Sequence, residues 1–209
     1  VETLIFGRAM ERALSPERFI IGCAEPGYPL PPSYFAYLNA FSCPLLPMRF
    51  ESAELAKISI NCCLVASVSI ANTLAELCEG IGADWSEIVP ALKLDGRIGP
   101  QAYLNPGLGI AGGNLERDLA TVINFSESIG SDSGIIKAWI ANSQYRKMAA
   151  ARMLRRYVLP GNPDPLIAVW GLAYKENTHS IKNSPSLATL AELSGFRFRV
   201  HDPVVPLDA

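Results

Sequence analysis

The chain has 209 residues, of which 49% are apolar and only 18% are charged, and its formal net charge is −2. This composition excludes a mainly disordered chain, which would be poor in apolar residues and rich in charge. It also lacks the strongly basic character of a nucleic-acid-binding protein. The five cysteines form no CxxC pair and there are only two histidines, so we expect a cytoplasmic protein without a disulfide framework or a metal site.

The first part of the chain is mixed in character. Short apolar runs of strand length lie at residues 19–23 (FIIGC) and 43–48 (CPLLPM), and a proline-rich stretch at residues 25–32 separates them. We predict a strand in each run.

A long helix is predicted from Ser52 to the Glu79-Gly80 pair, where glycine would cap it. Apolar residues occupy nearly all of its faces, so it should be covered on all sides, either as a core helix or at a subunit interface. Residues 58–75 carry no charge, but polar side chains interrupt them about once per turn. This pattern favours a buried helix of a soluble protein over a membrane span.

Three more helices are predicted at residues 84–93, 115–129 and 132–158, with a loop rich in glycine and proline after the first. The basic residues of the last of these helices are interpreted as a solvated face, because no aromatic residues alternate with them.

The final region begins after the linker sequence GNPDP (161–165). An apolar strand (166–174), a helix with a Ser-Pro start (184–193) and a second strand (196–202) predict the opening of a parallel βαβ sheet. Two strands and one helix do not make a complete doubly wound domain, so we expect the chain to be a truncated piece.

The loop Pro106–Gly113 (PGLGIAGG) contains a formal GxGxxG pattern, which alone would indicate a dinucleotide site. No buried strand precedes it, so the strand-turn-helix unit of such a site is missing. Two interpretations remain: a tight loop whose backbone amides approach a polar ligand, or an ordinary connection.

Two pairs of polar residues are further candidates for a functional role. Asn114 is best placed to be the N-cap of the following helix, and Asp118 lies one turn inside it, as a capping charge or an ionised base. Lys57 and Asn61 lie four residues apart on the long helix, where they either stabilise an oxyanion or take part in a salt bridge and a core hydrogen bond.

Taken together, these segments resemble the UDP-glucose/GDP-mannose dehydrogenase family. The matching sequences, which follow the family's order along most of the chain, are AELAKISIN (53–61), AELCEGIGADW (75–85), DGRIG (95–99), PGLGIAGGNLERD (106–118), GLAYKENT (171–178), Ser184-Pro185 and HDP (201–203).

The resemblance implies a mainly α central dimerisation domain flanked by incomplete α/β, Rossmann-like segments. Residues 1–48 would be the tail of an NAD-binding domain, residues 49–160 the central helical domain of a homodimer, and residues 161–209 the start of the nucleotide-sugar-binding domain. The implied activity is NAD-dependent oxidation of the C6 alcohol of a UDP-sugar. This piece alone, with most of the NAD domain missing, is not expected to bind NAD or turn over.

By the same resemblance, Lys57 and Asn61 stabilise the alkoxide and the tetrahedral intermediates, and Asp118 helps to activate water. Asn114 stands at the position of the nucleophile. Glu2 would match the catalytic glutamate, although Val1 stands where proline is usual.

The implied substrate contacts are Arg97, which reaches the substrate of the neighbouring subunit, Lys175 in the third domain, and the loop residues Gly109, Ile110, Gly112 and Gly113. Lys182 would be a cofactor contact.

The departures from the family pattern bear on the chemistry. The family loop reads roughly GFGGSCFxKD, and its cysteine forms a thiohemiacetal and then a thioester, but an asparagine amide at position 114 is not a comparable nucleophile. We expect Cys62 and Cys63 to be buried structural residues. The family's TDDxR is here Thr178–Lys182 (THSIK), which loses two acids and replaces an arginine by lysine.

Three interpretations stay open: a nucleotide-sugar dehydrogenase of altered chemistry, a non-catalytic nucleotide-sugar-binding and dimerisation homologue, and a related helical dehydrogenase domain with another substrate. The missing cysteine favours the second, and the retained Lys57, Asn61, Arg97 and Asp118 favour the first.

Overall fold

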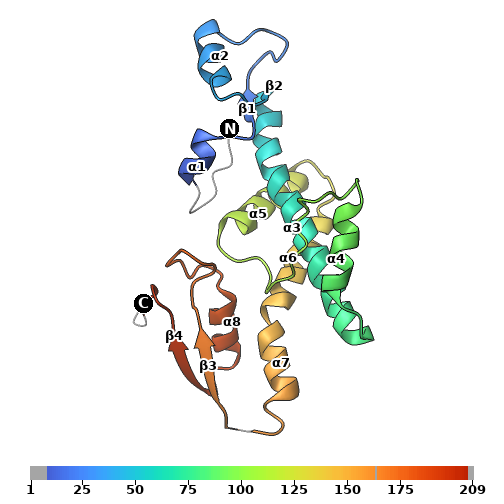
Figure 1. Cartoon of the computed structure of the whole chain (residues 1–209), viewed down its shortest axis with the longest axis vertical. Helices are drawn as coiled ribbons and strands as arrows, with labels where there is room; N and C mark the ends of the chain where they lie inside the picture. The colour runs from blue at the N-terminus through green and yellow to red at the C-terminus, as the bar shows by residue number, and fades with distance from the viewer. Residues whose placement is uncertain (1–8, 163, 207–209) are drawn as a thin grey trace. The chain divides into compact units, whose positions relative to one another are not determined.

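The computed structural model describes residues 9–162 and 164–206. In chain order the elements are α1 (Ala9–Leu14), β1 (Phe19–Gly22), α2 (Pro32–Asn39), β2 (Leu45–Met48), α3 (Phe50–Ile81), α4 (Trp85–Leu94), α5 (Asn114–Ser128), α6 (Gly134–Lys147), α7 (Ala149–Tyr157), β3 (Leu166–Trp170), α8 (Pro185–Glu192) and β4 (Arg197–His201) (Figure 1). The chain divides into two compact units, Val1–Asn61 and Cys62–Ala209, and the division falls inside α3. The architecture is the expected one, a helical middle part with short parallel strands on either side of it in the sequence.

The first unit is built around the parallel pair β1 and β2, which confirms both predicted strands. Phe19 lies opposite Leu45, and Gly22 lies opposite Met48. Helix α2 joins the strands, although its proline-rich start had indicated only a break between them; proline fits there because the first turn of a helix needs no N–H partner.

Helix α3 is longer than predicted at both ends. It passes Gly80 and ends at Ile81, where Gly82 takes a left-handed backbone with φ of 76°. The amide of Ala83 then donates to the carbonyl oxygen of Cys78 at 3.0 Å, the closure typical of a glycine-capped helix end. The predicted glycine cap therefore exists, but it is Gly82.

Within this chain α3 is not buried on all sides, so of the two expected alternatives it is not a fully enclosed core helix. Ile70, Leu77 and Ile81 are 51%, 54% and 69% exposed, and they share one face of the helix because they are spaced by seven and four residues. By length and composition alone α3 could cross a membrane, and 28% of its most apolar window is buried. These properties are weak evidence for a membrane span, since polar side chains recur along the helix. A subunit interface, the other alternative drawn from the sequence, accounts better for the exposed apolar face of Ile70, Leu77 and Ile81.

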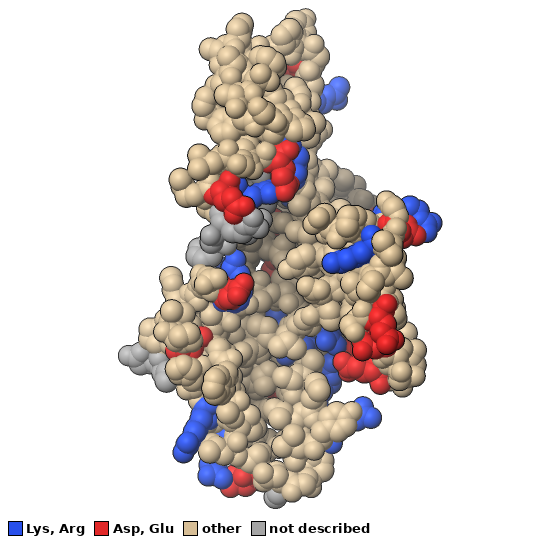
Figure 2. Space-filling model, viewed as in Figure 1, with Lys and Arg blue, Asp and Glu red and all other residues tan. Residues whose placement is uncertain are grey.

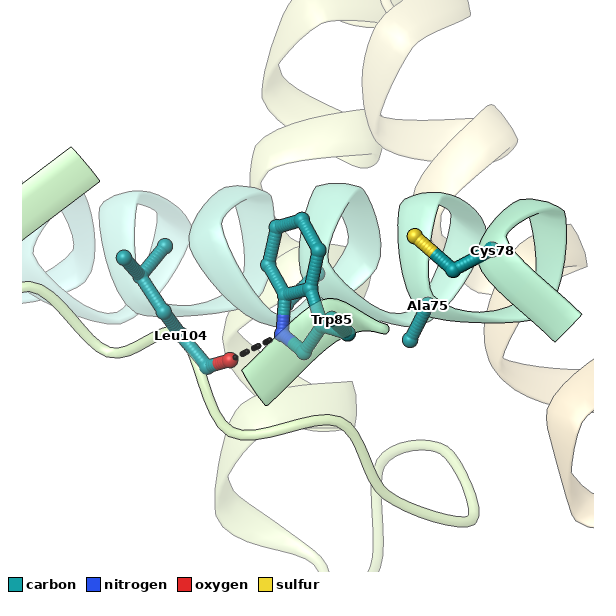
Figure 3. Packing of buried hydrophobic residues seen from close by; sticks show 5 residues of the cluster. Ala75, Cys78, Trp85 and Leu104 are labelled. Atoms are coloured by element: carbon teal, nitrogen blue, oxygen red, sulfur yellow. Dashed lines mark hydrogen bonds between the residues drawn. The ribbon is translucent and has the colours of Figure 1, made fainter. Parts of the chain in front are cut away.

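One hydrophobic core joins α3 to α4 and the following loop (Figure 3). Asp84 caps α4 by accepting from the amide of Ser86 at 2.7 Å. The adjacent Trp85 is buried against α3, and its indole N–H donates to the carbonyl oxygen of Leu104 at 2.9 Å. This bond satisfies the polar atom of a buried tryptophan and ties the loop before the glycine segment to the core.

A second core packs α5 and α6 against α3 through Val65, Ile110, Leu119 and Ile136. The buried Ile110 belongs to the glycine loop, so the loop is fixed to this core from within.

The single helix predicted at residues 132–158 is two helices, α6 and α7, separated at Met148. The carbonyl oxygen of Tyr145 accepts from the amide of Met148 at 3.2 Å and from the guanidinium of Arg152 at 2.5 Å. These donors replace the usual helical donor four residues on, and the helix breaks at that point.

The C-terminal strands β3 and β4 are parallel, and Leu166 to Trp170 lie opposite Arg197 to His201. Helix α8 connects them and lies beside them, and Ser184 caps it, as the Ser-Pro start predicted (Figure 1). Strand β3 is shorter than predicted because Gly171, with φ of 92°, turns the chain. Trp170 at its end is 84% exposed.

Asp202 closes the end of this βαβ unit. One carboxylate oxygen accepts from the amides of Leu172 and Ala173 at 2.7 and 3.1 Å, and the other accepts from those of Val204 and Val205 at 2.9 and 2.8 Å. Four backbone donors stabilise the charged form, which lowers the pKa of Asp202 far below its ordinary value.

The charged residues do not form a patch of one sign on the face that Figure 2 shows. Acidic and basic side chains are interspersed there among broad uncharged areas. This agrees with the low charged fraction of the sequence.

Candidate functional site

The candidate site is the glycine loop, Gly107–Gly113, at the start of α5. Its first residue is held from two sides: the amide of Gly107 donates to Asn72 Oδ1 at 2.6 Å, and its carbonyl oxygen accepts from Arg146 Nε at 3.2 Å. Asn72 is only 1% exposed, so this buried amide on α3 is a fixed anchor for the loop.

The middle of the loop is fixed by α6. Gly109 has φ of 86°, and a Cβ atom on it would lie 2.4 Å from the carbonyl oxygen of Ser143, so only glycine fits. The Ser143 hydroxyl accepts from the amide of Ile110 at 2.7 Å. Gly109 and Ile110 therefore shape the loop, and the Ile110 side chain lies in the core, only 6% exposed.

The last part of the loop, Gly112 to Asn114, is called the glycine corner below. It is held by the segment before α8: the amide of Gly112 donates to the carbonyl oxygen of Lys182 at 2.9 Å, and its carbonyl oxygen accepts from Asn183 Nδ2 at 2.7 Å. The Tyr174 ring packs against Gly112, 3.0 Å from where its Cβ would be.

Asn114 is not the helix cap that we expected. Gly113 occupies the cap position, and Asn114 is the first residue of α5, exposed and without a side-chain capping bond. Asp118, one turn further, is 4% exposed, and Arg117 Nη2 lies 3.5 Å from its Oδ1. Asn114 and Asp118 are four residues apart, so they lie one turn apart on the same side of α5, beside the glycine corner.

The two adjacent cysteines differ in burial. Cys62 is half-buried and packs against the core that contains Ile110, but Cys63 is exposed, contrary to the expectation that both are buried. Burial raises the pKa of the Cys62 thiol, and the negative charges of Cys63 and Asp118 raise it further. Cys62 is therefore held as a thiol and does not provide the thiolate that position 114 lacks.

Lys57 and Asn61 lie one turn apart on α3 in the first compact unit, and both are half-buried. This is the placement that the spacing predicted. Glu2 lies outside the described residues.

Arg97 is paired within its own loop. Its guanidinium donates to both oxygens of Asp95, at 3.0 and 2.7 Å, and its side chain is 90% exposed. Within this chain it is not brought to the glycine loop.

Of the two candidate lysines in the C-terminal region, Lys182 lies against the glycine corner and Lys175 lies beside Tyr174. The Lys175 ammonium lies 5.7 Å from the centre of the Tyr174 ring, which contacts Gly112. The side chain of Lys182 lies against Gly113, where Nζ would be 2.6 Å from a Cβ atom. Lys182, for which the resemblance implied a cofactor contact, thus lies at the glycine loop.

The sequence interpretation missed the residues that anchor the loop, which are Asn72, Ser143, Tyr174 and Asn183. Asn72 is one of the polar residues that interrupt the apolar long helix, and a buried amide there must have a partner. That requirement was the one available indication; the partners of the other three depend on contacts between distant segments.

Among the described residues, no glycine-rich turn joins a strand directly to a helix in the GxGxxG pattern. Strand β1 leads to α2 through residues 23–31, which contain a single glycine, and the glycine loop 107–113 follows no strand. Within residues 9–162 and 164–206, side chains of His, Cys, Asp and Glu also do not gather into a group of three that could hold a metal ion.

Two models of one protein family match this chain. The model of the UDP-glucose/GDP-mannose dehydrogenase family, central domain, matches residues 51–144, and that of the same family's UDP binding domain matches residues 168–209. The chain belongs to the UDP-glucose/GDP-mannose dehydrogenase family. The glycine loop thus lies in the matched central domain, and Lys182 and Asn183 lie in the matched UDP-binding domain.

Among the relatives of this family member, the UDP-glucose 6-dehydrogenase of Pseudomonas aeruginosa is 33% identical over 207 residues, which cover 97% of this chain and 45% of the relative. The TuaD enzyme of Bacillus subtilis is 28% identical over 205 residues and is covered to 44%. A solved UDP-glucose dehydrogenase from Pyrobaculum islandicum superposes with a TM-score of 0.85 at 32% identity, covering 97% of this chain and 46% of that one. The chain therefore spans about half the length of the relatives that it matches.

Proposed function

We propose that this chain is the nucleotide-sugar-binding core of an NAD-dependent dehydrogenase that oxidises the C6 alcohol of a UDP-sugar of the UDP-glucose type. The observation that carries the proposal is the glycine loop, which is anchored by the central domain at one end and by the UDP-binding domain at the other. NAD is the oxidant that the family resemblance implies. The described residues of this chain bind and position the sugar rather than the dinucleotide.

In this proposal, the residues of the central domain act on the sugar. Lys57 and Asn61 stabilise the developing alkoxide, as a cation and an amide on one helix face can do. Asp118, buried behind the glycine corner, positions the water that attacks the oxidised carbon.

The functional protein is proposed to be a homodimer formed through the central helices. The bare apolar face of α3 at Ile70, Leu77 and Ile81 is the surface available for it in the second unit. Arg97, highly exposed, would serve the neighbouring subunit's substrate.

A second candidate is a binding protein that keeps the nucleotide-sugar pocket without catalysis. Asn114 favours it, because an amide does not add to an aldehyde as a thiolate does, and Cys62 is held as a thiol.

The deciding experiment replaces the matching 207 residues of the Pseudomonas aeruginosa relative by this chain and counts NADH per UDP-glucose. Two NADH would show complete oxidation without a cysteine at position 114, and one NADH would show that the product is an aldehyde. No NADH with intact UDP-glucose binding in calorimetry would establish the binding protein. Failure of a folded chimera to bind any UDP-sugar would overturn both candidates.

Asn114→Cys in the same chimera is the matched variant. We expect it to raise turnover and to bring the stoichiometry to two NADH, because it places a thiol at a helix N-terminus, where thiolate character increases. Cys63→Ser, an exposed thiol change, serves as the control and should alter neither value.

A further inference from the structure

The segment at Asn183 is built into the glycine corner more closely than a chain connection requires. Asn183 has a left-handed backbone, with φ of 54°. From that position its side-chain amide donates to the carbonyl oxygen of Gly112 at 2.7 Å and also to the carboxylate of Glu116 in the first turn of α5. One side chain thus joins the UDP-binding domain to both the loop and the helix that follows it.

Glu116 is itself fixed by α6. Its other oxygen accepts from Lys147 Nζ at 3.0 Å, and the Lys147 side chain is only 6% exposed. A buried lysine side chain depends on its carboxylate partner, so the contact with Lys147 constrains the position of Glu116 from the side of α6.

Beside this contact, the amide of Gly112 donates to the carbonyl oxygen of Lys182, and the Lys182 side chain lies on Gly113. A cation is not favoured at the positive N-terminal end of a helix such as α5. The bonds of the adjacent Asn183 therefore help to hold the ammonium group of Lys182 against Gly113, where an anionic or strongly polar ligand group would meet it.

We propose that Asn183 and Glu116, backed by Lys147, are positioning residues that lock the glycine corner onto the UDP-binding domain, so that the sugar of a nucleotide sugar meets a preformed loop. The inference rests on the proposed function for its ligand. It assigns to the two residues a selective role in binding the sugar, while the nucleotide is bound elsewhere in the UDP-binding domain.

The test uses the 209-residue chain and four variants. Asn183→Gly removes the amide and keeps a backbone that glycine accepts. Asn183→Asp keeps the shape but repels Glu116 and cannot donate to Gly112. The control is Asn177→Asp, because Asn177 has the same left-handed backbone, φ 58°, and is exposed.

Hydrogen exchange without any ligand is the first measurement. We expect the peptide covering residues 109–116 to exchange about tenfold faster in both Asn183 variants, since the bonds that close this loop are lost. The control should exchange as the unchanged protein does. Unaltered protection in both Asn183 variants would overturn the proposal, whatever the ligand of this protein is.

Binding of UDP-glucose and of UDP by calorimetry is the second measurement. The dissociation constant for UDP-glucose should rise about fivefold or more in the Asn183 variants, and that for UDP by less than about twofold. Equal losses for both ligands would indicate a merely structural role and overturn the proposal. If the unchanged protein binds neither ligand, the proposed function fails, and the exchange measurement still decides whether the lock exists.

The double variant Asn183→Asp with Glu116→Gln supplies a rescue. It exchanges donor and acceptor between the two side chains and keeps one carboxylate near Lys147. We expect it to recover only part of the protection that Asn183→Asp loses, because the bond to the Gly112 carbonyl oxygen stays lost; a double variant no better than the single one would contradict a direct pairing of the two residues.

Discussion

Gly109 shows how one residue can determine the conformation of a loop. Its left-handed backbone and the carbonyl oxygen of Ser143 together leave no room for a side chain. Strain in the backbone and steric overlap are separate costs, and the chain offers a control that separates them.

Gly109→Ala should lower the free energy of unfolding by about 1–3 kcal/mol for the overlap and by about 1–2 kcal/mol for the left-handed backbone. Gly99 has nearly the same φ, 85° against 86°, and open space around it, so Gly99→Ala should show the backbone cost alone. Urea unfolding of the two variants measures the difference. Equal losses would mean that the loop can move away from Ser143.

Asp202 makes a prediction about acid stability. Because four amides favour its charged form, its pKa is lower in the folded chain than in the unfolded chain, where the ordinary value is 3.8. The stabilisation is complete above that value and is lost progressively as the pH falls below it, since the unfolded chain then binds the proton more strongly.

Asp202→Asn should therefore be clearly less stable than the unchanged protein at pH 7, and the gap between the two should narrow as the pH is lowered from 5 toward 2. Thermal unfolding followed across this range checks the trend. A gap that is independent of pH would show that the carboxylate charge is not what the four amides require.

The positions of individual residues could be predicted from the sequence where helical spacing alone determines them. They could not be predicted where the neighbouring residues determine which one takes the position. The four-residue spacing placed Lys57 and Asn61 one turn apart on a helix. Asn114, a favourable cap residue by type, lies inside α5, and Gly113 has the cap position although its type ranks lower.

At the scale of elements, Glu76 of α3 is the point at which α6 and α7 are joined to the long helix. Its carboxylate accepts from Tyr145 Oη at 2.7 Å and Arg146 Nη1 at 2.9 Å, and Arg152 Nη2 lies at 3.3 Å. Burial disfavours the charge, but these hydrogen bonds and the two guanidinium groups outweigh it and lower the pKa of Glu76.

Glu76→Gln should reduce the free energy of unfolding by about 1–2 kcal/mol, less than for a fully buried pair because a third of the side chain is exposed. Glu127→Gln is the matched control: its partner is Lys137, both side chains are more than half exposed, and about 0.5 kcal/mol or less is expected. Chemical unfolding measures both. If Glu127→Gln lowers the free energy of unfolding as much as Glu76→Gln does, the contacts of Glu76 contribute no more to stability than an exposed ion pair.

Most elements could be predicted from periodicity, and their ends could not. The βαβ unit formed by β3, α8 and β4 follows from its apolar strands and its Ser-Pro start. The break at Met148 depends on Arg152 reaching back to the Tyr145 carbonyl, a side-chain contact that hydrophobic spacing does not reveal. Helix α2 was missed because prolines that begin a helix resemble prolines that prevent one.

At the scale of the whole molecule, the family could be identified from motifs in order along the chain. The contact between the glycine corner and Asn183 could not be predicted from the sequence, because it joins positions 71 residues apart. Nor could the partial burial of α3, since an apolar sequence does not distinguish a core from a surface that awaits a second subunit.

That surface gives the prediction at this scale. Leu77→Glu should shift the chain from dimer to monomer, because it places a charge on the bare face of α3 that the proposed dimer buries. Sedimentation velocity over a range of concentrations measures the shift. Ile129→Glu, at a residue that is 78% exposed beyond the end of α5, is the control and should not change the association state.

Trp85 and Trp170 have different environments, so intrinsic tryptophan fluorescence can be used to follow this chain. Trp85 is sealed in a core and bonded to the Leu104 carbonyl, and Trp170 at the end of β3 is 84% exposed. A soluble quencher should therefore reduce the fluorescence of Trp170 at low concentration and that of Trp85 only at higher concentration. Once Trp139, a third tryptophan that is half-buried against the second core, is replaced by phenylalanine, fluorescence can report on the two family domains separately without any label.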